Sequence, residues 1–446
     1  MKSAKQLRAD VAGIWNLALR AVDPAAAVRR HVAKSGNELS AGGIRFDLDK
    51  VKRIWVLGAG KAAAPMAQAL EIILGDRLSG GAVVTRYGYG VPLERIQLIE
   101  AGHPFPDANS VAAGEMIARL AENRIGHRDL VICLLSGGGS ALLVAPAPGI
   151  TLEDKLLCTR VLLGCGAGIR EINAVRKHLS AIKGGGLARL LARVPVVSLI
   201  LSDVVGDELD TIASGPLVPD STTFGDCARI LRKYHIEGFV PPAVRKRIAA
   251  GVDGAVPENP KTGDPVFRKK LHTIVGSNAL ACAAAARGAR RRGYHTLVLT
   301  SRLEGDTAEA ARFHLGIAKE IVMHGRPLRR PACVISGGET TVRVAGAGKG
   351  GRNQEFALHC VRELAHLPAP CVAASLATDG ADGPTDAAGA VVDNTTLTRS
   401  LQFGATFLAD CINDNNSHEF FRRLGDLIVT GPTRTNVMDL HFVLIG

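Results

Sequence analysis

The chain has 446 residues, 47% of them hydrophobic and 22% charged, which is typical of globular proteins and long enough for two or three domains. Its net charge of +12 suits an enzyme for polyanionic small molecules, whereas only 4% aromatic residues and scattered basic residues argue against nucleic-acid binding. No apolar stretch reaches the roughly 18 residues of a membrane span, and nine cysteines without a C-x-x-C pair predict reduced thiols in a cytoplasmic protein.

Apolar runs rich in β-formers alternate with Ala- and Leu-rich helical stretches, which predicts a parallel α/β arrangement. We interpret residues 1–255 as a Rossmann-like domain, and its longest helix is expected to end at the glycines at 184–186. In chain order its predicted elements are an amphipathic helix over 1–19, strand 54–57, helix 61–74, strands 81–85 and 96–100, helix 110–121, strand 130–135, helices from 140 and over 152–183, and strand 196–201.

Composition changes over residues 251–270, where Gly, Pro, Asp and Lys dominate as in linkers. We place the domain boundary there, so residues 256–446 are expected to form a second α/β domain. Asn278 is predicted to cap its first helix. The predicted elements are strand 272–275, helix 278–292, strand 296–300, helix 306–324, strand 332–336, helix 353–364 and strand 371–377, with a hairpin over 340–344 and strand 440–445 as edge strands.

Four strand-like runs end in glycine-rich turns, and the Ser-Gly-Gly-Gly-Ser turn at residues 136–140 is the most informative. Glycines let an anion approach the backbone closely, and a helix that starts there presents free N–H groups. The four turns together predict the rim of an anion-binding cleft, although a tight strand-to-helix turn is the alternative for each. The residues expected to bind substrate or phosphate are Gly60, Ser136, Gly137, Gly138, Gly139, Ser140, Ser277, Asn278, Gly337, Gly338 and Glu339.

Residues 58–63, Gly-Ala-Gly-Lys-Ala-Ala, match the dinucleotide-binding fingerprint with alanine at its last small position. The acidic residue expected at the end of the following strand is missing. Thr85 and Arg86 stand there instead, which counts against NAD but leaves NADP open. Lys61 follows the glycines directly at a predicted helix start, where its charge opposes the helix dipole. This position predicts an anion beside Lys61.

Asp203 and Asp207 follow the apolar strand at residues 196–201. Open α/β sheets bind ligands at the carboxyl ends of their strands, so both carboxylates are expected at the ligand edge. Either could hold Mg²⁺ or accept a proton from the substrate. A helix cap followed by a turn is the alternative interpretation.

The run at residues 378–386 carries three carboxylates after another apolar strand. This density fits a hard cation, although the spacing differs from an EF-hand and turn formation explains much of the composition. We expect a role in magnesium or substrate binding for Asp379 and Asp382. Arg352 lies in a basic, glycine-rich segment at 349–355 that leads into a helix. It is predicted to stabilise charge on a transferring phosphoryl group, with a flexible hairpin loop as the alternative.

Taken together, these segments resemble the class II glycerate 2-kinases of the MOFRL family. One departure lies near the end of the chain, where the family's Thr-Gly-Thr-Asn-Val-Asn-Asp run appears with Arg434 and Met438 in place of the glycine and the second asparagine. The match covers residues 58–62, 101–104, 135–142, 172–180, 183–185, 201–207, 214–216, 276–278, 336–339, 350–355, 378–386 and 430–433.

The resemblance implies transfer of the γ-phosphoryl group of ATP to D-glycerate, giving 2-phosphoglycerate with Mg²⁺. It implies an active site in a cleft between the Rossmann-like domain and a MOFRL-type C-terminal domain. We expect Lys61, Arg352 and Asp203 to act in catalysis, and Asp207, Asp379 and Asp382 to hold the metal.

Two alternatives are weighed against the kinase. An NADP-dependent hydroxypyruvate reductase is supported by the fingerprint at residues 58–63 and opposed by the missing ribose-binding acid and by the lack of a His/Asp catalytic pair. A nucleic-acid-binding protein is supported by net charge alone. The sequence leaves assembly as a homodimer open.

Overall fold

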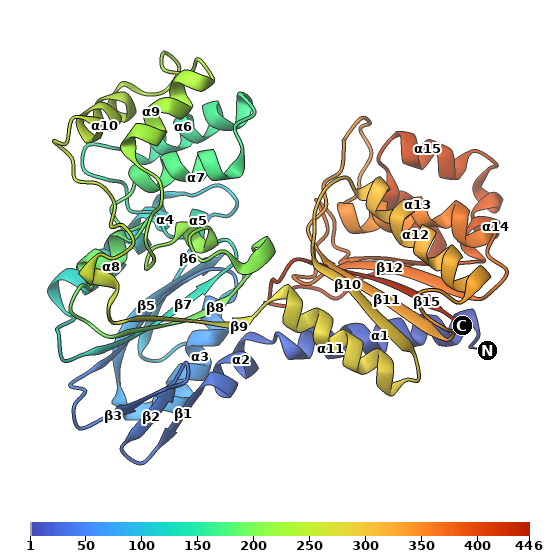
Figure 1. The fold of residues 1–446 in the computed structure, drawn as a ribbon, viewed down its shortest axis with the longest axis horizontal. Coiled ribbons are helices and arrows are strands. Elements are labelled where there is room, and N and C mark those ends of the chain that lie inside the picture. Colours follow the sequence, from blue (N-terminus) through green and yellow to red (C-terminus); the bar gives the residue numbers. More distant parts are fainter. Residues whose placement is uncertain (1) are drawn as a thin grey trace. The chain divides into compact units, whose positions relative to one another are not determined.

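The computed structural model describes residues 2–446, which form two compact units (Figure 1). Unit 2 is Pro24–Val275, and unit 1 combines the residues up to Asp23 with Gly276–Gly446. Strand β9 (Lys270–Gly276), which the sequence analysis assigns to the second domain, lies instead in the sheet of unit 2 beside β8. The glycine- and proline-rich segment before β9 therefore connects elements of unit 2. The predicted division after residue 255 does not coincide with the division into compact units.

The sheet of unit 2 has six strands in the order β6-β5-β4-β7-β8-β9, and β4 to β8 run parallel. This order confirms a Rossmann-like sheet, because the chain runs outward from β4 to β6 and then resumes on the other side of β4 with β7. The crevice above β4 and β7 is the place where such sheets bind ligands. The strands are β4 (Ile54–Ala59), β5 (Leu78–Arg86), β6 (Ile96–Ala101), β7 (Leu130–Ser136) and β8 (Val196–Leu201).

Helices cover both faces of this sheet (Figure 1). On one face lie α2 (Pro24–His31) and α3 (Ala63–Leu74), and on the other lie α4 (Ala108–Asn123) and α8 (Gly186–Leu190). A small antiparallel sheet that the sequence analysis does not predict precedes β4 and contains β1 (Val32–Ser35), β2 (Glu38–Ala41) and β3 (Ile44–Asp47).

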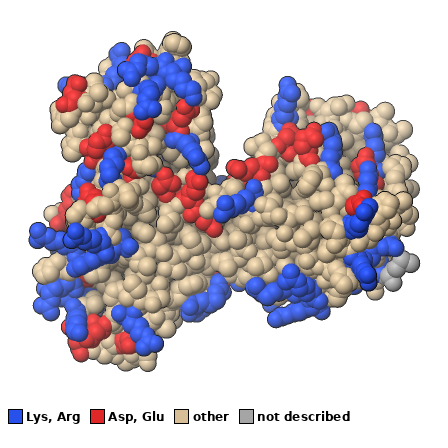
Figure 2. Space-filling model, viewed as in Figure 1, with Lys and Arg blue, Asp and Glu red and all other residues tan. Residues whose placement is uncertain are grey.

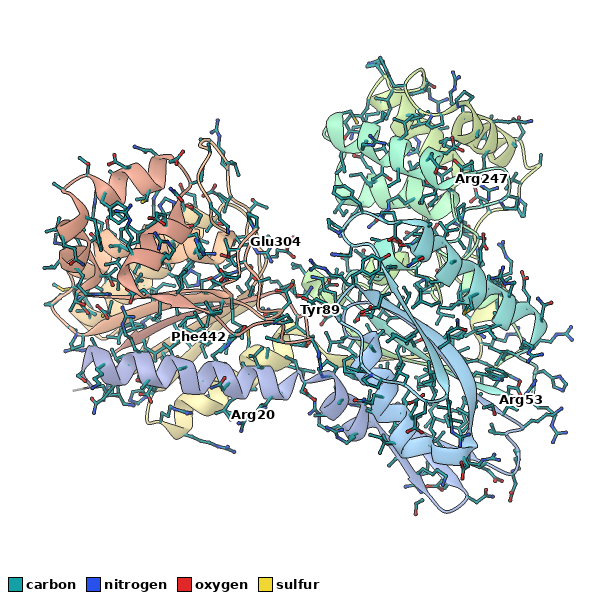
Figure 3. The ribbon with its side chains drawn as sticks, turned by 180° about the vertical axis from the view of Figure 1, so that it is seen from behind. Arg20, Arg53, Tyr89, Arg247, Glu304 and Phe442 are labelled. Carbon is teal, nitrogen blue, oxygen red and sulfur yellow. The ribbon has the colours of Figure 1, made fainter. Side chains whose placement is uncertain are left out.

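Four further helices of unit 2 form a second hydrophobic core, in the part where Figure 3 labels Arg247. The prediction of a single helix over residues 152–183 is wrong, because two separate helices, α6 and α7, lie in this range. Gly164, Gly166 and Gly168 interrupt it, because glycine favours the backbone conformations that end a helix. The four helices are α6 (Leu152–Gly164), α7 (Ile169–His178), α9 (Phe224–Lys233) and α10 (Pro242–Val252), and the one-turn helix α5 (Gly139–Leu142) precedes them.

Unit 1 contains a mixed sheet in the order β10-β11-β15-β12-β13-β14. Helices α1 (Ala4–Ala21) and α11 (Asn278–Arg291) pack on one face, where Figure 3 shows Phe442. The strands are β10 (His295–Leu303), β11 (Ala332–Gly338), β12 (Cys371–Ala377), β13 (Gly389–Asp393), β14 (Leu427–Ile428) and β15 (Asp439–Ile445). The other face carries α12 (Thr307–His324), α13 (Arg352–Ala365), α14 (Thr396–Ser400), α15 (Phe407–Asn413) and α16 (Ser417–Leu424).

Three local predictions for unit 1 are wrong. Strand β15 is not an edge strand, because β11 pairs with one of its sides and β12 with the other. All residues of β15 are buried. Residues 340–344 form no hairpin, and only Thr341 makes an isolated bridge, to Asp306. The cap of α11 is Ser277, whose hydroxyl accepts the backbone N–H of Leu280, so Asn278 is the first residue of the helix.

Within residues 2–446 the structure contains no helix with the length and apolarity needed to cross a membrane. All nine cysteines are free thiols, and eight of them are buried. On the face drawn in Figure 2, Lys and Arg form separate groups with Asp and Glu between many of them. This face shows no continuous basic stripe of the kind that nucleic-acid binding favours.

Candidate functional site

The loops that follow β4 and β7 contact each other at the reversal point of the unit 2 sheet. The backbone N–H of Lys61 donates to the carbonyl of Gly137 over 2.8 Å, and that of Ala62 donates to Ser136 Oγ over 3.0 Å. Gly60 has a φ of +131°, and a Cβ at this position would lie 2.2 Å from Ser136 Oγ. Only glycine therefore fits between the two loops. The structure thus brings Gly60, Lys61 and the 136–140 turn together.

Lys61 is buried at this contact, with 8% of the residue exposed. Its backbone lies just before α3, whose first turn contains no acidic residue and whose N-cap makes no side-chain hydrogen bond. A cation beside the positive end of a helix is unfavourable unless negative charge is present. An anionic ligand at this position would be attracted both by the Lys61 ammonium group and by the positive end of α3.

The end of the 136–140 turn packs against a second glycine- and serine-rich segment. Ser140 Oγ lies 2.8 Å from Ser214 Oγ, and the carbonyl of Ser140 accepts a hydrogen bond from Lys183 Nζ over 2.9 Å. Lys183 is 2% exposed, and this burial holds the pKa of its ammonium group well below the usual value. The sequence analysis assigns no role to Lys183 or Ser214, although both lie in segments that carry the family resemblance.

Asp203 and Asp207 follow β8, which is the neighbour of β7, so both lie on the edge of the sheet that carries the 136–140 turn. Asp207 ends a 3-10 turn (Val205–Asp207) and has a φ of +59°. Among residues 2–446, no group of three or more His, Cys, Asp or Glu side chains could hold a metal ion. A Mg²⁺ ion at this edge would take most of its ligands from phosphate oxygens and water, as it commonly does.

In unit 1, Arg352 is the first residue of α13 and bridges two carboxylates. Its Nη1 donates to Glu339 Oε1 over 2.6 Å, and its Nη2 donates to Asp439 Oδ1 over 3.2 Å. Burial raises the pKa of Asp439 to about 7, although Arg352 opposes this shift. Burial would lower the pKa of Arg352, but Asp439 and Glu339 outweigh it and raise that pKa. The sequence analysis missed Asp439 as a partner, because the two residues lie 87 positions apart in the chain.

Asp382 anchors the start of α13. Its Oδ1 accepts hydrogen bonds from the backbone N–H of Asn353 over 3.0 Å and from the side-chain amide of Asn353 over 3.1 Å. Its Oδ2 accepts hydrogen bonds from the backbone N–H and the side-chain amide of Gln354, each over 2.9 Å. Four donors on two oxygens leave no lone pair for a metal ion, so Asp382 does not fit the predicted metal role. Instead it fixes the helix turn that carries Arg352. Asp379 accepts the backbone N–H of Ala381 over 3.1 Å, which is the geometry of a turn.

The glycines before Glu339 serve packing. A Cβ on Gly337 would lie 1.9 Å from Asn278 Oδ1, so the amide of Asn278 fills the space beside β11. Asn278 Nδ2 donates to the carbonyls of Val437 and Asp439 over 2.8 and 2.9 Å. A Cβ on Gly338 would lie 2.2 Å from the backbone carbonyl oxygen of Leu303 in β10. These contacts do not resemble a phosphate cradle, since their space is already occupied.

The predicted site residues fall into two clusters, one in each unit. The meeting of Lys61 with Arg352 stays a prediction. Unit 2 holds Gly60, Lys61, Ser136, Gly137, Gly138, Gly139, Ser140, Asp203 and Asp207, and unit 1 holds Ser277, Asn278, Gly337, Gly338, Glu339, Arg352, Asp379 and Asp382.

Arg434→Gly is expected to stabilise unit 1. Arg434 is exposed and has a φ of +61°, a left-handed conformation that disfavours residues with a Cβ. Glycine removes this strain and should raise the free energy of unfolding by about 1 kcal/mol. Thermal unfolding measures the effect, and Arg434→Ala is the matched control because alanine removes the side chain but keeps the Cβ. Equal midpoints for the glycine and alanine variants would contradict the prediction.

Glu355→Gln is expected to stabilise unit 1 increasingly as the pH rises above 4.5. Burial raises the pKa of Glu355 from 4.5 to about 7. The folded state therefore holds this proton more tightly than the unfolded state, and stability is lost as pH rises from 4.5 through 7. The variant should gain up to about 3 kcal/mol over the wild type at pH 8, and the difference should shrink toward pH 4.5.

Urea unfolding at several pH values tests the Glu355 prediction. Glu309→Gln makes the same chemical change at an exposed position of α12. A gain for Glu355→Gln that does not vary with pH would rule out the titration of Glu355 as its cause.

Comparison with known proteins gives matches over nearly the whole chain. Residues 10–249 match a family described as a domain of unknown function (DUF4147), and residues 332–439 match the MOFRL family. Glycerate 2-kinase of Pyrococcus horikoshii is 44% identical, and the alignment covers 96% of this chain and 95% of that protein. A protein of Agrobacterium vitis that is provisionally named hydroxypyruvate reductase is 43% identical, with 88% and 87% covered. The crystal structure of glycerate kinase from Thermotoga maritima superposes with a TM-score of 0.87 at 38% identity, with 99% and 100% covered.

Proposed function

Because the chain belongs to the MOFRL family, and matches glycerate 2-kinases over nearly its full length, we propose that it phosphorylates the 2-hydroxyl group of D-glycerate with ATP. The observation that carries this proposal is the contact of the β4 and β7 loops, which places the buried Lys61 beside the 136–140 turn at the ligand edge of the unit 2 sheet. Phosphoryl transfer needs positioning and charge neutralisation rather than a covalent intermediate. A lysine and backbone N–H groups supply both.

Each residue has a defined task in this proposal. Lys61 attracts the negative charge that spreads over the oxygens of the transferring group, and the 136–140 turn orients that group or the glycerate carboxylate. Asp203 orients the attacking hydroxyl group and accepts its proton. Arg352, which the family resemblance assigns to the same reaction, adds a second cation whose direction is fixed by Glu339 and Asp439.

Magnesium is part of the proposal at the end of β8. Asp207 would hold it together with phosphate oxygens and water, because Mg²⁺ is usually bound through one or two carboxylates and substrate phosphates. When bound, the ion neutralises charge on the phosphates. A cytoplasmic location is proposed from the nine free thiols, and a homodimer stays a prediction.

The provisional name of the Agrobacterium vitis relative favours hydroxypyruvate reduction as the second candidate. The end of β5 opposes NAD in the usual dinucleotide position but leaves NADP open. Strand β5, the second strand of the sheet, ends at Arg86 after Thr85, and it carries no carboxylate for the ribose hydroxyl groups of NAD. The kinase is the better supported function, because proteins named glycerate kinase match this chain over nearly its full length.

One assay separates the two candidates. The full-length protein is incubated with ATP, MgCl₂ and D-glycerate, and the product is identified by phosphorus NMR. A second sample receives NADPH and hydroxypyruvate without ATP. We expect 2-phosphoglycerate in the first sample and no NADPH oxidation in the second. Oxidation of NADPH without phosphoglycerate in the first sample would overturn the proposal.

A further inference from the structure

A pocket of about 690 Å³ is lined only by residues of unit 2, among them residues of the helices α5, α6 and α7. Its volume falls in the range of roughly 300–1,000 Å³ that is usual for small-molecule sites. The walls are largely apolar and include Phe105, Val144, Leu152, Leu156 and Leu163. The pocket can therefore hold the apolar body of a ligand much larger than a three-carbon acid.

Among the described residues, no Asp or Glu lines this pocket. Its lining contains four cationic side chains, those of Lys155, Arg160, Arg176 and Lys183. Lys155 Nζ donates to the carbonyl of Leu179 over 2.9 Å. Burial lowers the pKa of Lys155 to about 7, and the nearby Arg176 adds to this effect. Burying a cation such as Lys183 without a carboxylate partner is costly, and a bound anion would offset this cost.

Ser140 connects this pocket to the candidate site. It lines the pocket and also ends the 136–140 turn that contacts Lys61 through Gly137. The carbonyl of Ser140 accepts hydrogen bonds from Lys183 Nζ over 2.9 Å and from Arg176 Nη2 over 3.4 Å. The cationic part of the pocket thus adjoins the place where the proposed function requires the transferring phosphoryl group.

Of the two proposed substrates, only ATP combines a large, flat, apolar body with several negative charges. On the basis of the proposed function, we propose that this pocket receives the adenine base and ribose of ATP. The apolar walls between α6 and α7 contact the base, and Arg176 and Lys183 attract the phosphate chain toward the 136–140 turn. The adenine and the ribose are then held by residues of unit 2.

Two variants test this assignment. Arg160→Glu reverses an exposed charge at the pocket, and Leu156→Trp fills the space between the walls. The dissociation constants of the non-hydrolysable analogue AMP-PNP, with MgCl₂, and of D-glycerate are measured separately by calorimetry. We expect Arg160→Glu to bind AMP-PNP about tenfold more weakly, which corresponds to about 1.4 kcal/mol. Leu156→Trp should weaken binding further, and D-glycerate affinity should change less than about twofold.

Arg245→Glu is the matched control, because it reverses an exposed charge on α10 outside the pocket. Circular dichroism checks whether Leu156→Trp folds. If it does not fold, the AMP-PNP affinity of the surface variant Arg160→Glu alone tests the pocket assignment. Unchanged AMP-PNP affinity in both variants would overturn the pocket assignment even if the wild type phosphorylates glycerate. A loss of D-glycerate affinity instead would also overturn it. If the variants weaken AMP-PNP but glycerate is no acceptor, the pocket assignment stands and only the proposed function falls.

Discussion

Lys61→Met is expected to lower kcat for D-glycerate phosphorylation by roughly a hundred- to a thousandfold, the usual effect of removing one group that stabilises transition-state charge. Methionine keeps much of the length and apolar volume of the lysine side chain but removes its charge. The backbone N–H of Lys61, which donates to Gly137, is unaffected, so the contact between the two loops is retained. The fold of unit 2 should therefore survive the change.

Steady-state kinetics with both substrates varied measures this effect. A role in the transition state predicts that kcat falls much more than the KM for ATP rises. Lys34→Met is the matched control, since Lys34 is an exposed lysine of the same unit on the small β1–β3 sheet. Turnover of Lys61→Met near that of Lys34→Met would remove Lys61 from the catalytic machinery.

Arg352→Met is expected to reduce both activity and stability. The proposed function assigns Arg352 to stabilise charge on the phosphoryl group, so activity should fall by roughly a hundredfold or more. Removing Arg352 also leaves the carboxylate of Asp439, which is fully buried, without its cationic partner. Breaking a buried pair in this way costs about 3–5 kcal/mol of the free energy of unfolding.

A second substitution separates these two effects. In Arg352→Met/Asp439→Asn the buried charge is gone, so much of the stability should return while activity stays low. Arg362→Met, at an exposed position of the same helix, controls for the loss of an arginine from α13. Recovery of activity in the double variant would show that Arg352 acts only on the structure. Full activity of the single variant would end its catalytic assignment.

Much of the fold of unit 2 follows from local sequence patterns. The strands β4, β7 and β8 are short, almost entirely apolar runs bounded by turn residues, and their positions are predicted within a residue or two. Patterns of this kind indicate that a strand exists but not which strand pairs with it. The sheet to which β9 belongs and the central position of β15 depend on partners far away in the chain, so local periodicity cannot reveal them.

The candidate site shows the same division. Gly60, Lys61 and the 136–140 turn could be predicted to lie together, because parallel strands bring their carboxyl ends to one edge of the sheet. Asp382 and Gly337 resemble ligand-binding residues in the sequence, but one caps a helix and the other makes room for an amide. Caps, close packing and phosphate cradles use the same small and acidic residues, so composition alone cannot distinguish them.

The division of the chain also has a consequence for its synthesis. All of unit 2 is one continuous stretch, whereas unit 1 is discontinuous and takes α1 from the beginning of the chain. The apolar face of α1, with Leu7, Ile14 and Trp15, is buried in the finished protein, but its partner α11 is translated only after the whole of unit 2. During translation, the apolar face of α1 therefore stays exposed to solvent until all of unit 2 has been synthesised. A C-terminal fragment that begins at Gly276 would lack this helix from the outset.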